Sequence, residues 1–120
     1  MMSLDPRVAR WQAAWEGFDP AAVAALYLPD GTHASAKVAM ALGDGRTALA
    51  GQADIAEYAR RAFARYTRLE FRVVRVLSGE GFTVVEYDRT AEPGPAAPMR
   101  VAELFEWAGD RIAACRVYHF

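Results

Sequence analysis

The sequence contains only one cysteine and two histidines, and its charges nearly cancel. One cysteine permits neither an intrachain disulfide nor a cysteine-rich metal site. With 14 Lys and Arg against 15 Asp and Glu, the net charge of -1 gives no reason to expect binding to nucleic acid or to an anionic membrane. No apolar run approaches the roughly 18 residues that a membrane span requires.

Further absences narrow the expected class of protein. The first six residues lack the basic and apolar segments typical of a signal peptide, so we expect a cytoplasmic protein. A length of 120 residues fits one domain, 1–120, with a single hydrophobic core. Neither histidine belongs to a metal-site spacing such as HxH or HExxH, and we expect no metal and no organic cofactor.

Helix signals fill most of the first half of the chain. Asp5-Pro6 and Asp19-Pro20 each predict a helix start, because Asp caps the first turn and Pro fits the first helical position. Helices are therefore expected over 6–17 and 20–28, and a third over 52–66. On the first helix, helical spacing relates Leu4, Val8, Trp11 and Trp15. The segments between the helices are expected to be a turn at 29–31, an extended stretch over 32–40, a turn at 43–45 and a short strand near 46–50.

The second half alternates polar and apolar residues, as strands do. Strands are expected over 69–77 and 82–91, followed by a Pro-rich loop at 92–98 and a final hairpin that turns at 108–110. The alternation leaves the register of the strand from 82 open. Either Glu86 and Asp88 or Thr83, Val85 and Tyr87 face inward, with a slight preference for Tyr87 inside.

The final hairpin predicts one wall of a pocket. Because side chains alternate along a strand, Glu103 shares a face with Val101, Phe105 and Trp107. On the return strand, Cys115, Val117 and His119 share one face. A carboxylate among large apolar neighbours must be paired, protonated or functional, because its uncompensated burial is too costly. A buried salt bridge or a hydrogen bond to Trp or Tyr is the structural alternative to a functional role.

Helices gathered before an antiparallel meander predict an α+β fold. The expected form is a cone-shaped roll, in which a strongly bent mixed or antiparallel sheet wraps around about three N-terminal and central helices and leaves a cavity at its open end. The chain resembles the nuclear transport factor 2-like superfamily, which includes ketosteroid isomerases, SnoaL-like polyketide cyclases and limonene epoxide hydrolases. The ordered segments that carry the resemblance are Trp11-x-x-x-Trp15 before Asp19, Leu26 to His33, Gly51-x-x-x-Ile55-x-x-Tyr58, Glu103-x-Phe105 and Gly109 to Ile112.

The resemblance carries function over only in part. It implies that Glu103 occupies the place of the acid that donates a hydrogen bond to an oxyanion in ketosteroid isomerases. The place of their general-base aspartate is Ser35 here, and the place of their oxyanion-hole tyrosine is Trp11. The aspartate that epoxide hydrolases carry on the last strand is Val117. The resemblance therefore favours the broad SnoaL-like group over steroid isomerisation or epoxide hydrolysis.

Three functions remain open from the sequence. The domain binds a small apolar molecule and acts as a cofactor-independent acid/base isomerase or cyclase, with Glu103 as acid and His33 or His119 as base. Alternatively, it binds a ligand without catalysis, or it is a dimeric interaction module whose pocket is vestigial. The pocket is expected to include Trp11, Trp15, Ser35, Tyr58, Phe63, Tyr87, Phe105, Trp107, Cys115 and Val117. The helix-borne aromatic residues among them could equally be core, and Cys115 an inert wall residue.

The outer face of the last strands predicts a partner surface. Tyr118 and Phe120 alternate away from the pocket wall, beside Leu104 of the neighbouring strand. An exposed apolar patch of this kind is typical of an association surface. We expect a homodimer through this convex sheet face.

Overall fold

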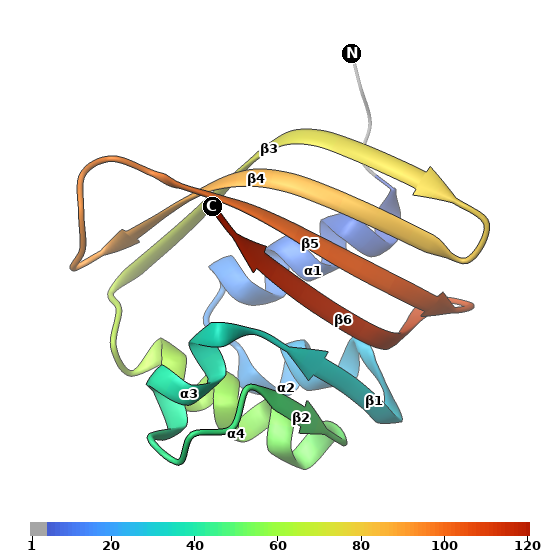
Figure 1. The fold of residues 1–120 in the computed structure, drawn as a ribbon, viewed down its shortest axis with the longest axis horizontal. Helices are drawn as coiled ribbons and strands as arrows, with labels where there is room; N and C mark the ends of the chain where they lie inside the picture. Colours follow the sequence, from blue (N-terminus) through green and yellow to red (C-terminus); the bar gives the residue numbers. More distant parts are fainter. Residues whose placement is uncertain (1–4) are drawn as a thin grey trace.

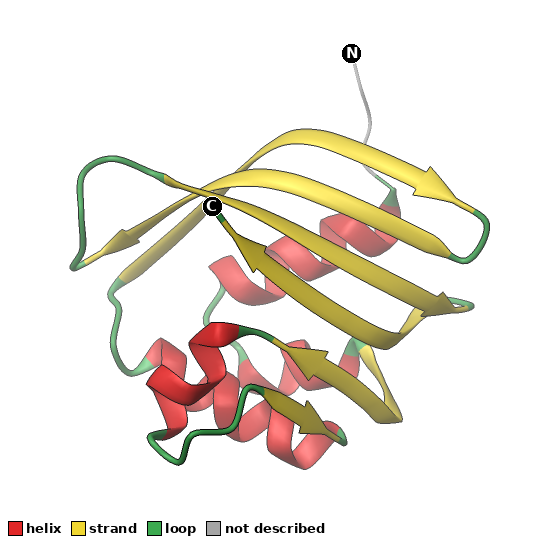
Figure 2. Cartoon of the chain, in the orientation of Figure 1, coloured by secondary structure: helices red, strands yellow, loops and turns green. Residues whose placement is uncertain are grey.

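The computed structural model describes residues 5–120, so Leu4 lies outside the described residues. A six-stranded sheet with the strand order β2-β1-β6-β5-β4-β3 curves over four helices. Figures 1 and 2 show α1 beneath the long strands β3 to β6, while α2, α3 and α4 gather near β1 and β2. The fold is the α+β roll expected from the sequence, with a mixed sheet.

Both Asp-Pro helix starts are confirmed. Asp5 caps α1 (Pro6–Glu16) by accepting a 2.8 Å hydrogen bond from the backbone N–H of Arg7, and Asp19 caps α2 (Pro20–Ala25) with a 3.1 Å bond from that of Ala22. The third expected helix is α4 (Gln52–Phe63). The predicted second helix is too long, because β1 (Tyr27–Ala34) begins directly after it and passes through the expected turn at 29–31. The pairing of β1 with β6 shifts register between Tyr27 and Thr32, which accommodates that segment.

The prediction of an extended stretch over 32–40 is wrong beyond residue 34. Residues Ala36–Leu42 form helix α3, which Ser35 caps through a 3.1 Å hydrogen bond from the backbone N–H of Lys37. The helix ends at Gly43, whose φ of 72° is left-handed. Its sequence is rich in Ala, Lys, Leu and Met, which are strong helix formers, and the short β2 (Ala48–Ala50) follows.

The predicted meander and final hairpin are confirmed. β3 (Arg68–Gly79), β4 (Phe82–Glu92), β5 (Met99–Ala108) and β6 (Arg111–His119) are joined antiparallel in sequence order. β1 pairs with β6 in parallel, so it extends the sheet beyond the last strand of the chain. This pairing sets His33 beside Cys115, and the final hairpin sets Glu103 opposite Val117.

The open register of β4 is resolved in favour of Tyr87 inside. Thr83, Val85 and Tyr87 are buried. On the opposite face, the Arg100 guanidinium lies 2.6 Å from a Glu86 carboxylate oxygen and 2.7 Å from one of Asp88. Charged pairs therefore occupy the middle of the convex sheet face.

Trp11 centres the core between α1 and the concave face of the sheet. Its ring lies 5.2 Å from Phe71, 5.1 Å from Tyr87 and 5.5 Å from Phe105, measured between centroids. Aromatic pairs at these separations add to the stabilisation from burial. Within residues 5–120, no helix has the length and apolar composition needed to cross a bilayer.

Candidate functional site

A cavity of about 70 Å³ lies among β1, α3, α4 and the concave side of the sheet. Its buried lining includes His33, Ser35, Tyr58, Tyr87 and Glu103. Its more accessible lining includes Lys37, Met40, Arg65, Tyr66, Arg89 and His119. A cavity of this size holds several water molecules or one small ring.

Glu103 is a buried carboxyl group without a cationic partner. Its side chain is 5% exposed, Oε1 accepts a 2.6 Å hydrogen bond from the Tyr87 hydroxyl, and Oε2 accepts a 3.3 Å bond from the Cys115 thiol. Burial raises the pKa of Glu103 to about 7, and the hydrogen bonds oppose that rise. Of the two structural alternatives for Glu103, the salt bridge is wrong and the hydrogen bond to a tyrosine is confirmed, and the pKa of this carboxyl lies near neutrality.

The neighbours of Glu103 stay neutral. Burial raises the pKa of the Tyr87 hydroxyl and of the Cys115 thiol well above their usual values, and the nearby Glu103 charge raises both further. The Trp11 side chain also helps to hold the pKa of Glu103 down, although its indole Nε1 is buried without a hydrogen-bond partner. Glu103 is consequently the group in this cluster whose charge can change near pH 7.

His33 is a buried imidazole on β1. Its Nδ1 shares a 2.8 Å hydrogen bond with the Tyr27 hydroxyl, and its ring lies 5.3 Å from that of Tyr58. Burial lowers the pKa of His33 to about 4, so the ring is neutral at physiological pH. Its Nε2 is buried without a partner in a side chain that lines the cavity. An unpartnered buried nitrogen costs free energy that a bound water or ligand would recover.

The structure brings together eight of the thirteen residues expected at the site. Glu103, His33 and His119 line one cavity with Trp15, Ser35, Tyr58, Tyr87 and Val117. His119 is partly buried, and burial together with the charges of Lys37 and Arg89 lowers its pKa. Ser35 acts as the cap of α3 rather than as a strand residue.

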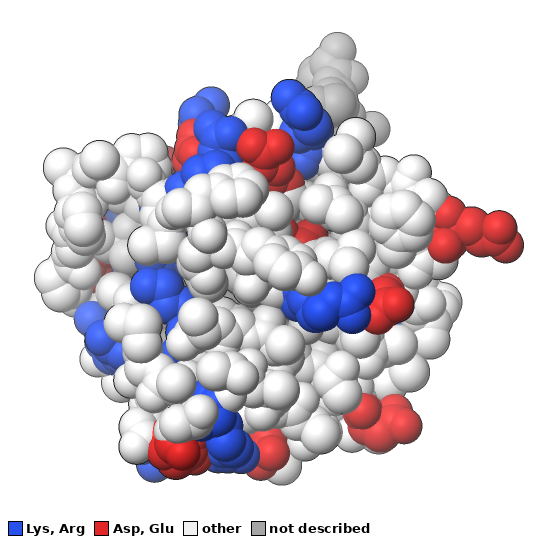
Figure 3. All heavy atoms as spheres, viewed as in Figure 1, with Lys and Arg blue, Asp and Glu red and all other residues white. Residues whose placement is uncertain are grey.

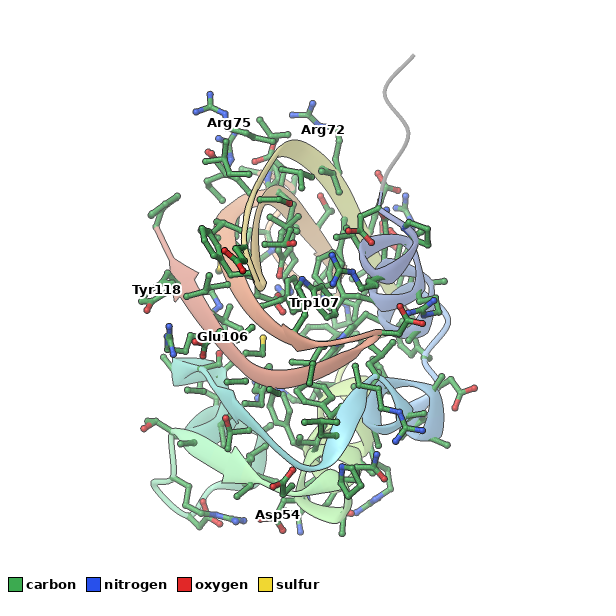
Figure 4. All side chains as sticks on the ribbon, turned by 90° about the vertical axis from the view of Figure 1, so that its right-hand side faces the viewer. Asp54, Arg72, Arg75, Glu106, Trp107 and Tyr118 are labelled. Atoms are coloured by element: carbon green, nitrogen blue, oxygen red, sulfur yellow. The ribbon has the colours of Figure 1, made fainter. Side chains whose placement is uncertain are left out.

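The other five expected pocket residues do not line this cavity. Trp11 and Phe105 are fully enclosed in the core, and Cys115 lies behind the Glu103 carboxyl. Phe63 stacks on Phe18 at 4.9 Å. Trp107 lies away from the cavity, toward α1 (Figure 4), where its indole donates a 2.9 Å hydrogen bond to Thr83 and the Arg7 guanidinium covers its ring.

Sequence reasoning missed Tyr27 and the basic residues of the cavity. Tyr27 fell within the predicted second helix, so its place on β1 beside His33 was not foreseen. Lys37, Arg65 and Arg89 come from three distant segments, and nothing in their local sequence signals that they converge. Among residues 5–120, no group of three or more His, Cys, Asp or Glu side chains is arranged to hold a metal ion.

The bent sheet, the helices beneath it and the cavity at its open end define a domain of the nuclear transport factor 2-like superfamily. The chain belongs to the SnoaL-like domain family, whose sequence pattern matches residues 8–115. No curated protein matches the chain by sequence.

Several solved structures share the fold with low sequence identity. A hypothetical protein with a ketosteroid isomerase-like fold from Catenulispora acidiphila, in complex with trimethylamine, is 21% identical, with a TM-score of 0.78 over 97% of this chain and 86% of that one. An LEH-like epoxide hydrolase from M. tuberculosis is 21% identical, with a TM-score of 0.75 over 96% of this chain and 80% of that one. A candidate polyketide cyclase from Sinorhizobium meliloti is 16% identical, with a TM-score of 0.77 over 96% and 95%. At these identities the likeness establishes the fold alone.

Proposed function

We propose that this SnoaL-like domain binds a small apolar, carbonyl-bearing molecule and performs cofactor-independent proton transfer on it, as in an isomerisation or cyclisation. The observation that carries the proposal is that Glu103, with a pKa of about 7, shares a cavity with the neutral imidazole of His33. The proposal is consistent with similar folds described as ketosteroid isomerase-like and as a candidate polyketide cyclase.

Glu103 is the better proton-transfer group of the two. A general acid or base works best when its pKa lies near the working pH, which holds for Glu103 but not for His33 at about 4. Protonated Glu103 would donate a hydrogen bond to the carbonyl oxygen as negative charge develops there. Neutral His33 would hydrogen-bond the ligand through Nε2 and hold it in place. His119, closer to solvent in the same lining, is the candidate base that would take the proton from the α-carbon of the ligand.

A ketone with exchangeable α-hydrogens tests this chemistry without knowledge of the natural substrate. We expect the wild type to accelerate hydrogen–deuterium exchange at the α-carbon of cyclohexanone, a one-ring ketone, in D₂O, followed by proton NMR. Glu103→Gln keeps the shape but cannot transfer a proton, so it should lose on the order of 10²–10⁴-fold in exchange rate. His33→Ala should mainly weaken binding of the ketone.

Glu106→Gln is the matched control, because Glu106 is exposed on the same strand and lies toward the convex face (Figure 4). It should exchange at the wild-type rate. Equal exchange rates in Glu103→Gln and the wild type would contradict the catalytic proposal. Binding of cyclohexanone without any acceleration would instead favour a non-catalytic ligand-binding domain.

A further inference from the structure

Basic side chains converge on the accessible side of the cavity from separate parts of the chain. Lys37 comes from α3, Arg65 follows α4, and Arg89 comes from β4, and all three line the cavity together with His119 of β6. Their positions are set by the helix α3 and by the strand order, not by a local basic motif. The fold itself therefore gathers positive charge at this place.

These cations differ from most others in the protein because no acid neutralises them. Within residues 5–120, eight of the fourteen Lys and Arg residues form ion pairs with Asp or Glu. Three of the remaining six are Lys37, Arg65 and Arg89, and they line the same cavity. Figure 3 shows the usual arrangement on one face of the molecule, where several basic groups lie beside acidic ones. The cavity departs from that arrangement.

The contacts of Arg65 and Arg89 leave their charges without a neutralising partner. The Arg89 guanidinium lies 5.1 Å above the Tyr66 ring, and Arg65 donates a 3.2 Å hydrogen bond to the backbone carbonyl of Met40. Neither contact supplies a negative charge. Among residues 5–120, Glu103 is the only acid in the lining, and it is buried and is protonated below a pKa of about 7.

The same cations lower the pKa of two titratable groups at the cavity. Partial burial raises the pKa of Tyr66, but the adjacent Arg89 guanidinium and the charges of Arg65 and Lys37 bring it below the usual value. Burial lowers the pKa of His119, and Lys37 and Arg89 lower it further. The contributions of the cations to both pKa values have the sign expected of a field that favours anions.

We propose that the ligand of this cavity carries an anionic group, a carboxylate or a phosphate, held by Lys37, Arg65 and Arg89, while its apolar part extends toward Glu103 and His33. This inference deepens the proposed function, since it rests on the cavity being the ligand site. Guanidinium groups hydrogen-bond carboxylates and phosphates through two nitrogens, and a lysine adds a point charge. In a partly water-excluded cavity such contacts are stronger than at an open surface. The anionic group would also fix which atom of the ligand reaches Glu103.

Matched one-ring probes separate the charge from the apolar contact. We expect phenylacetate to bind the wild type at least about tenfold more tightly than phenylacetamide, its neutral counterpart, in calorimetric or NMR titrations. Phenyl phosphate distinguishes the two kinds of anionic group. If it binds more tightly than phenylacetate, the natural ligand is assigned a phosphate; if it binds more weakly, the natural ligand is assigned a carboxylate. Raising the salt concentration from about 0.05 M to 0.5 M should weaken the anionic probes but not phenylacetamide.

Substitutions test which side chains bind the anionic group. Lys37→Gln and Arg89→Gln should each weaken phenylacetate binding about three- to tenfold and leave phenylacetamide unchanged. Arg75→Gln is the control, because Arg75 (labelled in Figure 4) is an exposed arginine of the edge strand β3 and is not among the residues that line the cavity. If Arg89→Gln fails to fold, Lys37→Gln and the salt dependence of binding to the wild type still test the proposal.

Equal affinities of phenylacetate and phenylacetamide, or an equal loss in Arg75→Gln, would overturn the proposal. That failure is distinct from failure of the proposed function, which is measured by ketone exchange and by Glu103→Gln. Glu103→Gln should keep the preference for the anionic probe.

Discussion

Two buried titratable residues, an acid and an imidazole, line one cavity, and burial favours the neutral form of each. Burial keeps Glu103 protonated up to a pKa of about 7 and keeps His33 neutral down to about 4. Both groups are therefore uncharged in the folded state between about pH 4 and about pH 7. The hydrogen bonds from Tyr87 and Cys115 to Glu103 are too weak to cancel the cost of burying its charge.

The first prediction concerns the pH dependence of stability. The pKa of Glu103 is raised from 4.5, so its contribution to the free energy of unfolding is fully present below pH 4.5 and is lost as pH rises toward 7. The pKa of His33 is lowered from 6.5, so its contribution is fully present above pH 6.5 and is lost as pH falls toward 4. Each contribution is on the order of 3 kcal/mol, and the two slopes oppose each other.

Single substitutions should expose these opposing slopes. Between about pH 4.5 and 6.5, Glu103→Gln should become more stable with rising pH relative to the wild type, because only the His33 contribution remains. His33→Asn should become less stable with rising pH over the same interval. Urea unfolding at several pH values measures both. Identical pH profiles in all three proteins would show that neither pKa is shifted by folding.

The second prediction concerns the Tyr87 hydroxyl. Because its hydrogen bond to Oε1 opposes the effect of burial, Tyr87→Phe should raise the pKa of Glu103 further, and should cost about 1 kcal/mol of stability. Carbon-13 NMR of the glutamate carboxyl groups follows the titration directly. Tyr118→Phe serves as control, since Tyr118 is 51% exposed on the outer face and should leave the titration of Glu103 unchanged. A lowered pKa of Glu103 in Tyr87→Phe would refute this account.

The sequence identified these central residues but not their whole surroundings. Strand alternation placed Glu103 on the same face as large apolar residues, and His33 was named as a candidate base without a settled strand register. Tyr27 was missed because its spacing with Val23 also fits a helix. The convergence of Lys37, Arg65 and Arg89 depends on tertiary packing, about which local patterns carry no information.

At the scale of elements, the strongest local signals were the most reliable. The Asp-Pro caps and the alternating C-terminal strands are formed as predicted, because capping and alternation act within a few residues. Helix α3 was missed because it has only seven residues and nearly all of them are apolar, so no alternation of polar and apolar faces marks a helical period. The parallel pairing of β1 with β6 joins segments about 80 residues apart, which no local pattern could reveal.

The third prediction concerns the end of α3. Gly43 has a φ of 72°, a conformation that costs a residue with a Cβ about 1 kcal/mol, although nothing lies within 4 Å of the added atom. Gly43→Ala should therefore lower the free energy of unfolding by about 1 kcal/mol, measured in urea. Gly43→Asn should lose less, because Asn tolerates this conformation better. A larger loss for Asn than for Ala would contradict the conformational explanation.

At the scale of the whole molecule, the two faces of the sheet serve different purposes. The concave face encloses the core and the cavity, while the convex face carries the ion pairs of Arg100 with Glu86 and Asp88. Near the last strand this outer face carries the ion pair of Arg116 with Glu106 and also Tyr118, which is 51% exposed, and the chain ends at Phe120, which is 77% exposed. Figure 4 shows Tyr118 on the outer side of the sheet, away from α1.

The last prediction is a homodimer through the convex sheet face, centred on Tyr118, Phe120 and Leu104. An exposed tyrosine and phenylalanine near each other are costly to leave in water, and aromatic residues are enriched where proteins associate. Sedimentation velocity at micromolar concentration should show a dimer for the wild type. Tyr118→Lys should shift it toward monomer, because it places two uncompensated charges in the dimer interface. Leu77→Lys is the control, since Leu77 is similarly exposed, at 56%, but lies on the edge strand β3, from which β4 and β5 separate β6 in the sheet. A wild-type monomer, or a dimer that Tyr118→Lys leaves intact, would rule out this interface.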